Sequence, residues 1–115
     1  MIYKIYELVG ECAITADDGQ KVYDQIHPQL LAGHPVELDF TGVKILATLF
    51  FNFAIGQLLK DISADNLNQL LKFPALSSHG VTILERVIPS AKRYYFDEQH
   101  RKAVDSVMAD MAATI

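Results

Sequence analysis

Two periods of apolar residues divide this chain into predicted strands and helices. Residues 36–40 carry an apolar side chain at every second position, which predicts a strand. Thr41-Gly42 then provides a turn. From Thr48 the period changes, because apolar residues over 48–59 cover most of the circumference of a helix. We therefore expect residues 48–59 to form a buried central helix, with the Thr48 hydroxyl as its N-cap.

The N-terminal residues predict a hairpin. Residues 2–9 are rich in β-branched and aromatic side chains and predict a strand, and Gly10-Glu11 could turn the chain into a second strand over 12–15. We expect Cys12 to be a small buried apolar residue of that second strand. A reactive thiol would need nearby cations, which the local sequence lacks.

A helix is expected between the hairpin and the strand at 36–40. Thr15 stands three positions before Asp18, as in a capping box, and Gly33 is a plausible C-terminal stop. Pro28 should kink the helix or split off its last turn. Apolar residues spaced by four form one stripe: Val22, Ile26 and Leu30.

The second half of the chain predicts one strand and two helices. Residues 67–73 read as a third core strand, and Ser77-Ser78 could cap a helix that runs to Ile88. Pro89 should end that helix and begin a final one. Apolar residues of the final helix share one predicted inner face: Ala91, Tyr95, Val104, Met108 and Met111.

Length and order indicate the fold class. A chain of 115 residues is large enough for one domain that buries a core without disulfides, so we expect a single domain over 1–115. Alternating strands and helices predict an α/β fold with a mostly parallel sheet, an N-terminal hairpin and a C-terminal helix.

Charge, cysteine content and hydropathy indicate the compartment and the kinds of contact that we expect for this chain. The net charge of −4 argues against general nucleic-acid binding, and the single cysteine fits a reducing compartment. The N-terminus lacks the pattern of a signal peptide, and the longest apolar run is too short to span a membrane. We expect a soluble cytoplasmic domain that contacts neither nucleic acid nor membrane.

No motif predicts a cofactor, a metal ion or catalytic residues. The four histidines, at 27, 34, 79 and 100, lack zinc-ligand spacing, and we expect structural or surface roles for them. There is no phosphate-binding glycine loop and no nucleophile elbow. Lys92-Arg93-Tyr94-Tyr95 and Arg101-Lys102 could build a nucleic-acid surface, but a solvated helix face is the simpler interpretation.

Asp39 is the acid at the end of the predicted core strand. Its carboxylate could accept backbone N–H groups of the following turn, as Asx turns do. The alternative is a functional contact, because open α/β sheets place their sites at the carboxyl ends of the strands.

The stretch Leu38-Asp39-Phe40-Thr41-Gly42-Val43, followed by an apolar helix, resembles the signature of STAS domains, the fold of anti-sigma-factor antagonists. It is most similar to the STAS-like family of uncharacterised bacterial proteins, and the similarity extends from about Thr15 to Tyr95. The resemblance implies a (βα) superhelix domain. It also implies a regulatory role through protein partners, such as a histidine-kinase-like ATPase or an anti-sigma factor, rather than catalysis.

Typical antagonists carry Asp-Ser-Ser-Gly at the start of the central helix, and the second serine is phosphorylated. In this chain the motif falls on Ala47-Thr48-Leu49-Phe50, so the acceptor position is Leu49, which has no hydroxyl. Thr48 is the remaining candidate, and we predict that it is not phosphorylated.

The leading hypothesis is therefore a non-enzymatic interaction module without the usual phosphoserine switch. The predicted partner-binding residues lie on the 41–48 loop and just beneath it: Asp39, Thr41, Gly42, Lys44 and Thr48. Lys44 is the one charge in an apolar stretch, so it should face water or a partner. The alternatives are a small ligand-binding domain or enzyme, with a cleft near Asp39, Thr48 and His79, and a homodimer that buries an apolar patch.

Overall fold

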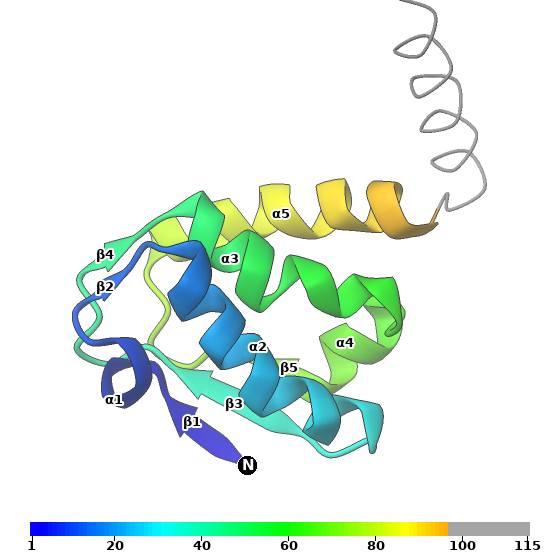
Figure 1. Ribbon diagram of the computed structural model, residues 1–115, viewed down its shortest axis with the longest axis horizontal. Coiled ribbons are helices and arrows are strands. Elements are labelled where there is room, and N and C mark those ends of the chain that lie inside the picture. Colours follow the sequence, from blue (N-terminus) through cyan, green and yellow to red (C-terminus); the bar gives the residue numbers. More distant parts are fainter. Residues whose placement is uncertain (97–115) are drawn as a thin grey trace, which may run out of the picture.

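The computed structural model describes residues 1–96, which form an α/β domain (Figure 1). The helices and strands follow in the order β1 (Ile2–Lys4), α1 (Ile5–Val9), β2 (Cys12–Ala13), α2 (Ala16–Leu31), β3 (Val36–Asp39), β4 (Ile45–Leu46), α3 (Thr48–Ala54), the 3-10 helix η1 (Gly56–Lys60), α4 (Ala64–Leu70), β5 (Leu71–Lys72) and α5 (Ser78–Phe96).

The strands form two small sheets. One sheet has the order β1-β3-β5, the other pairs β2 with β4, and all three described pairings are parallel. The predicted α/β fold with a mostly parallel sheet and a C-terminal helix is confirmed.

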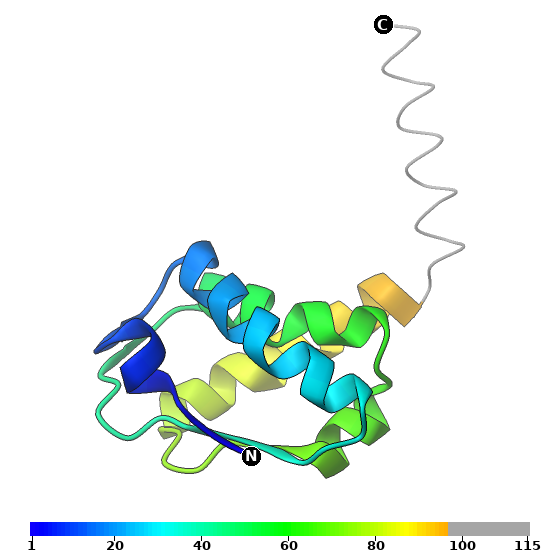
Figure 2. The same cartoon turned by 60° about the horizontal axis from the view of Figure 1, so that its bottom comes forward.

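The three-stranded sheet is covered on one face. Val36 and Leu38 of β3 are buried beneath α2 and α3, which lie on the same side of β1 and β3 in both views (Figures 1 and 2). The opposite face carries charges in register, Lys4 beside Asp39 and Glu37 beside Lys72. Opposite charges on paired strands attract each other and tolerate water, so this face needs no covering layer.

Helix α3 contributes the two largest fully buried side chains of the core. Phe50 and Phe51 of α3 are almost fully buried, and the ring of Phe51 stacks on Phe40 at a centroid distance of 5.8 Å. The helix is shorter than predicted, because the chain tightens into η1 after Ile55. Leu58 and Leu59 of η1 remain buried, so the apolar run still forms one continuous core.

Helix α2 begins and ends as predicted. The Thr15 hydroxyl accepts a hydrogen bond from the backbone N–H of Asp18, and Gly33 has a φ of +82°. The N–H groups of Gly33 and His34 bond to the carbonyls of Leu30 and Gln29, which is a Schellman C-cap. Pro28 lies inside the helix, which continues to Leu31 without splitting.

The predicted N-terminal hairpin is wrong. Only residues 2–4 form a strand, and residues 5–9 form the helix α1. Ile5, Leu8 and Val9 face the core at helical spacing, a signal that the β-branched composition obscured. β1 pairs with β3 and β2 pairs with β4, both in parallel, so the two N-terminal strands do not pair with each other. Cys12, expected to be buried, is exposed, since Ala13 is the residue of β2 that faces inward.

The predicted strand over 67–73 is mostly helix. Ser63 caps α4 by accepting a hydrogen bond from the N–H of Asn66, and the helix then runs to Leu70. Only Leu71 and Lys72 join the sheet as β5. The cap at Ser63 favours a helix more strongly than the apolar run favours a strand. Only the short extended segment after Leu70 remains for the sheet before Pro74.

The predicted break at Pro89 is also wrong, because α5 continues from Ser78 to Phe96. Proline removes one helical hydrogen bond, to the carbonyl four residues earlier. That carbonyl belongs to Glu85, which is exposed and open to water. The predicted cap at Ser77 is confirmed by its hydrogen bond from the N–H of Gly80. Ala91 and Tyr95 pack against the core, whereas Val104, Met108 and Met111 lie outside the described residues.

Substitutions at Thr15 and Thr48 test which of the two hydroxyls caps a helix. Thr15→Ala should lower the free energy of unfolding by about 0.5–2 kcal/mol, because the N–H of Asp18 loses its acceptor. Thr48→Ala should be nearly neutral, since the Thr48 hydroxyl makes no capping bond. Urea denaturation measures both, and equal midpoints for Thr15→Ala and the wild type would exclude the cap.

Candidate functional site

The candidate site is built at the carboxyl end of β3. The Asp39 carboxylate accepts two hydrogen bonds from Thr41: one from the backbone N–H at 2.9 Å and one from the hydroxyl at 2.6 Å. This is the Asx turn that the sequence predicts. The N–H bond holds the backbone of the turn and the hydroxyl bond holds the Thr41 side chain against Asp39, so the two residues are joined at both points.

The same bonds alter the acidity of Asp39. The Thr41 hydroxyl, and next the Thr41 N–H, hold the pKa of the Asp39 carboxyl below its usual value. Desolvation of the carboxylate opposes these two effects and raises the pKa of Asp39, and the more distant charge of the Lys4 ammonium, the weakest of the four influences, lowers it. A lowered pKa means that the charged form is favoured in the folded state. The stabilising contribution is therefore present at neutral pH and is lost as the pH falls through the folded-state pKa.

This acidity is measurable. In an NMR titration of the side-chain carboxyls, Asp39 should titrate below the usual pH range of aspartate. Thr41→Val removes the hydroxyl donor and should move the midpoint upward, toward the ordinary value. A midpoint that is the same in both proteins would show that the hydroxyl does not bond to Asp39 in solution.

Gly42 is required for two reasons. Its φ is +87°, a backbone conformation that residues with a side chain rarely adopt. In addition, a Cβ at this position would lie 3.2 Å from Cδ2 of Tyr6. The Tyr6 ring thus covers the turn and helps to line a hollow of about 200 Å³, together with Lys4, Glu7, Asp39 and Thr41. This volume is below the roughly 300 Å³ at which small-molecule sites begin, and neither Thr48 nor His79 lines the hollow.

The 41–48 loop holds a short strand that the sequence did not reveal. Ile45 and Leu46 form β4 beside β2, and the N–H groups of Lys44 and Ile45 bond to the carbonyl of Glu11. Lys44 is exposed, as expected, and its Nζ lies 3.7 Å from the Glu11 carboxylate. Because both side chains are more than half exposed, the pair contributes about 0–1 kcal/mol and could exchange for a partner's charge.

The start of α3 differs from the prediction in one respect. Ala47 occupies the N-cap position and Thr48 is the first helical residue, so the expected cap by Thr48 is wrong. The backbone N–H of Ala47 bonds to the carbonyl of Ala13, and this bond already anchors the entry to the helix. Thr48 is exposed, and so are its apolar neighbours Ile45, at 52%, and Leu49, at 50%.

The predicted residues therefore lie along one end of the molecule rather than around one cleft. Asp39 and Thr41 are joined by hydrogen bonds, whereas Lys44 and Thr48 flank β4. Figure 1 shows α1, β2 and β4 together at the end where β1 and β3 terminate. The sequence interpretation missed Ile45 and Leu49, because exposed apolar residues inside an apolar run carry no distinguishing signal.

The remaining candidate residues have structural surroundings. His27 Nε2 lies 2.9 Å from an Asp61 oxygen and its ring stacks on Tyr23, so it ties α2 to the end of η1. Lys92 and Arg93 are exposed on α5. Among residues 1–96, no three metal-binding side chains converge, and no helix is both long and apolar enough to cross a membrane.

The observations define a class: a small α/β domain with a one-sided parallel sheet, whose candidate site is an exposed loop and helix start rather than a deep pocket. Residues 18–81, more than half of the chain, match the family described as "STAS-like domain of unknown function (DUF4325)", and the chain belongs to this family. The match begins in α2 and ends in the first turn of α5. No curated protein and no solved structure matched the chain. The family description names no reaction.

Proposed function

We propose that this STAS-like domain is a non-enzymatic, cytoplasmic regulatory module that binds another protein through the 41–48 loop and the first turn of α3. One observation carries the proposal. Ile45 and Leu49 are each half exposed and each follows an exposed polar residue, Lys44 and Thr48, at the helix start where antagonist STAS domains carry their switch. Exposed apolar groups rimmed by polar ones are typical of protein-binding surfaces.

The chemistry of this surface favours binding without a phosphate switch. Leu49 stands at the position that corresponds to the phosphorylated serine of antagonist STAS domains. It offers the partner an apolar side chain in place of a hydroxyl. Thr48 has no acid before it, since position 47 is alanine. The partner is expected to be a protein such as a histidine-kinase-like ATPase or an anti-sigma factor, as the STAS resemblance suggests.

The competing proposal, a ligand-binding domain or enzyme at Asp39, has less support. The hollow there is small, and the Asp39 carboxylate is already engaged by two hydrogen bonds from Thr41. These bonds also lower the pKa of Asp39, whereas a general acid or base works best with a pKa near the operating pH. Asp39 is better suited to holding the loop in shape than to chemistry.

The test uses a charge reversal with a matched control. In affinity capture from the native host, Lys44→Glu should reduce recovery of the partner by about tenfold, equivalent to about 1.4 kcal/mol. Lys60→Glu reverses an exposed lysine at the end of η1 and should leave recovery unchanged. If the same partner is recovered equally by both variants and by Thr41→Arg, this loop is not the binding surface.

A further inference from the structure

A second feature lies between α4 and β5 on one side and α5 on the other. Two adjoining hollows, of about 270 and 330 Å³, share Ala64 and Asp65 as lining residues. We name them together the α4–α5 groove. The residues lining the first are Ala64, Asp65, Leu67, Asn68, Leu71, Phe73 and Ile88. The residues lining the second are Leu59, Ile62, Ser63, Ala64, Asp65 and Lys92.

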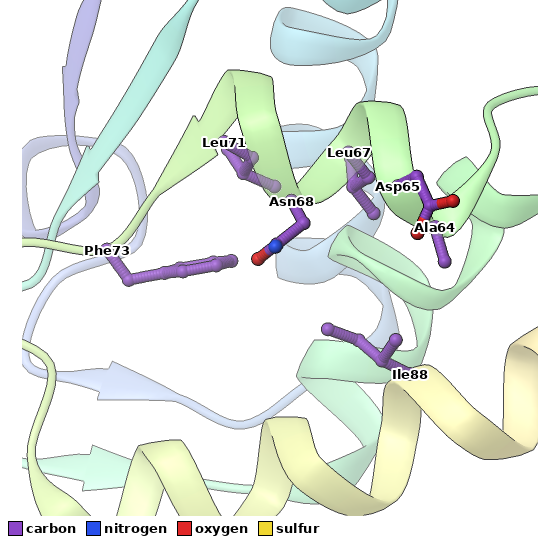
Figure 3. A pocket seen from close by; sticks show the side chains of 7 residues that line it. All are labelled: Ala64, Asp65, Leu67, Asn68, Leu71, Phe73 and Ile88. Atoms are coloured by element: carbon purple, nitrogen blue, oxygen red, sulfur yellow. The ribbon is translucent and has the colours of Figure 1, made fainter.

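Apolar side chains form most of the lining of the groove, and residues 1–96 leave it unfilled. Figure 3 shows Phe73 and Asn68 pointing into the open space of the first hollow, with Ile88 of α5 opposite them. Phe73 and Ile88 pack against the core yet remain partly exposed. Protein interiors are close-packed, so an apolar space of this size favours an occupant with apolar side chains.

The groove ends close to the point where the rest of the chain begins. Lys92 lines the second hollow, and Phe96 follows it after one turn of α5, about 6 Å along the axis. Ile88, opposite the first hollow, lies about 12 Å back along α5 from Phe96. Seven residues, 97–103, could span at most about 23 Å, which is enough to return to that hollow.

The sequence beyond Phe96 has the matching chemistry. Val104, Met108 and Met111 recur at spacings of four and three, the period that gathers apolar side chains on one face of a helix. Arg101-Lys102 precedes this apolar stretch, and Asp65 lies at the junction of the two hollows. A chain passing from Phe96 along the groove would bring these cations to Asp65 and the apolar residues to the first hollow.

We propose that residues 104–111 of the same chain bind in the α4–α5 groove, with Val104, Met108 and Met111 against its apolar lining. Binding within one chain is favoured over binding of a second copy, because the short connection after Phe96 gives the segment a high local concentration.

Disulfide trapping tests the proposal in the full 115-residue chain. Cys12→Ser removes the single native thiol, and Asn68→Cys with Met108→Cys places one new thiol on each side of the proposed contact. A disulfide needs Cα atoms within about 7 Å. Asn68→Cys with Ser106→Cys is the matched control, because residue 106 lies on the opposite face of the helical pattern.

The 68–108 pair should oxidise at least tenfold faster than the 68–106 pair and give a cross-linked monomer on a non-reducing gel. Asp65→Cys with Val104→Cys, compared with Asp65→Cys and Ser106→Cys, repeats the test at the other end if the first pair impairs folding. A cross-linked dimer would mean that a second copy occupies the groove, and equal oxidation rates would mean that the segment does not lie there. Either result overturns the proposal.

Discussion

Phe51→Ala should lower the free energy of unfolding by about 3–5 kcal/mol, the largest single-residue effect that we expect in this domain. Phe51 is fully buried and contacts two other rings, stacking on Phe40 and meeting Phe50 edge-on at a centroid distance of 5.3 Å. Truncation removes these contacts and leaves a cavity between β3 and α3 that rigid neighbours cannot fill. A domain with about 5–15 kcal/mol of total stability would lose a large part of it.

Phe53→Ala is the matched control, because Phe53 belongs to the same helix and is 36% exposed. Its truncation should cost clearly less than that of Phe51 in urea denaturation followed by circular dichroism. Phe51→Leu keeps most of the volume and should cost less than about 1.5 kcal/mol, which secures a measurement if the alanine variant does not fold. Equal costs for Phe51→Ala and Phe53→Ala would show that Phe51 is not packed more tightly than Phe53.

Gly19→Ala should also destabilise the domain, by about 1–3 kcal/mol. Helices α2 and α3 approach so closely at Gly19 that a Cβ would lie 2.5 Å from the Phe50 carbonyl oxygen and 2.8 Å from the Phe53 Cβ. Real Cβ atoms do not occupy such positions, so the two helices would have to move apart. This cost exceeds the gain of up to about 1 kcal/mol from the higher helix propensity of alanine.

Gly56→Ala provides the comparison. A Cβ at Gly56 would lie 3.6 Å from its nearest neighbours, Ala91 and Val87, which is an ordinary contact distance. That substitution should change the denaturation midpoint little, although Gly56 is also buried. If Gly19→Ala were as stable as Gly56→Ala, the close approach of α2 and α3 would not exist in solution.

The elements that the sequence predicted correctly are those specified by neighbouring residues. Thr15 caps α2, Gly33 ends it, and the alternation of Val36 and Leu38 marks β3. Each of these signals acts within four residues, through a hydrogen bond or a periodicity. The Asx turn at Asp39 is local in the same sense, since both donors belong to Thr41.

The errors arose where distant residues decide. β1 pairs with β3 across more than thirty intervening residues, and no local feature of residues 2–4 favours that partner over β2. Pro89 is tolerated because α5 packs along the core and Glu85 faces water, which the proline itself does not indicate. Ile45 and Leu49 escaped notice for a related reason: only the assembled fold decides which residues of an apolar run remain exposed.

The most direct test of the proposed interaction surface is the affinity of the purified domain for the partner recovered by capture, measured by isothermal titration calorimetry. Leu49→Asp should weaken binding by at least about 30-fold, because it places a charge at the centre of the apolar contact, where truncations alone cost about 2 kcal/mol or more. Leu31→Asp is the matched control: Leu31 is 54% exposed and lies at the end of α2, away from β4 (Figure 1). We expect wild-type affinity for Leu31→Asp and lost affinity for Leu49→Asp. Wild-type affinity in Leu49→Asp, with the fold intact, would exclude Leu49 from the binding surface.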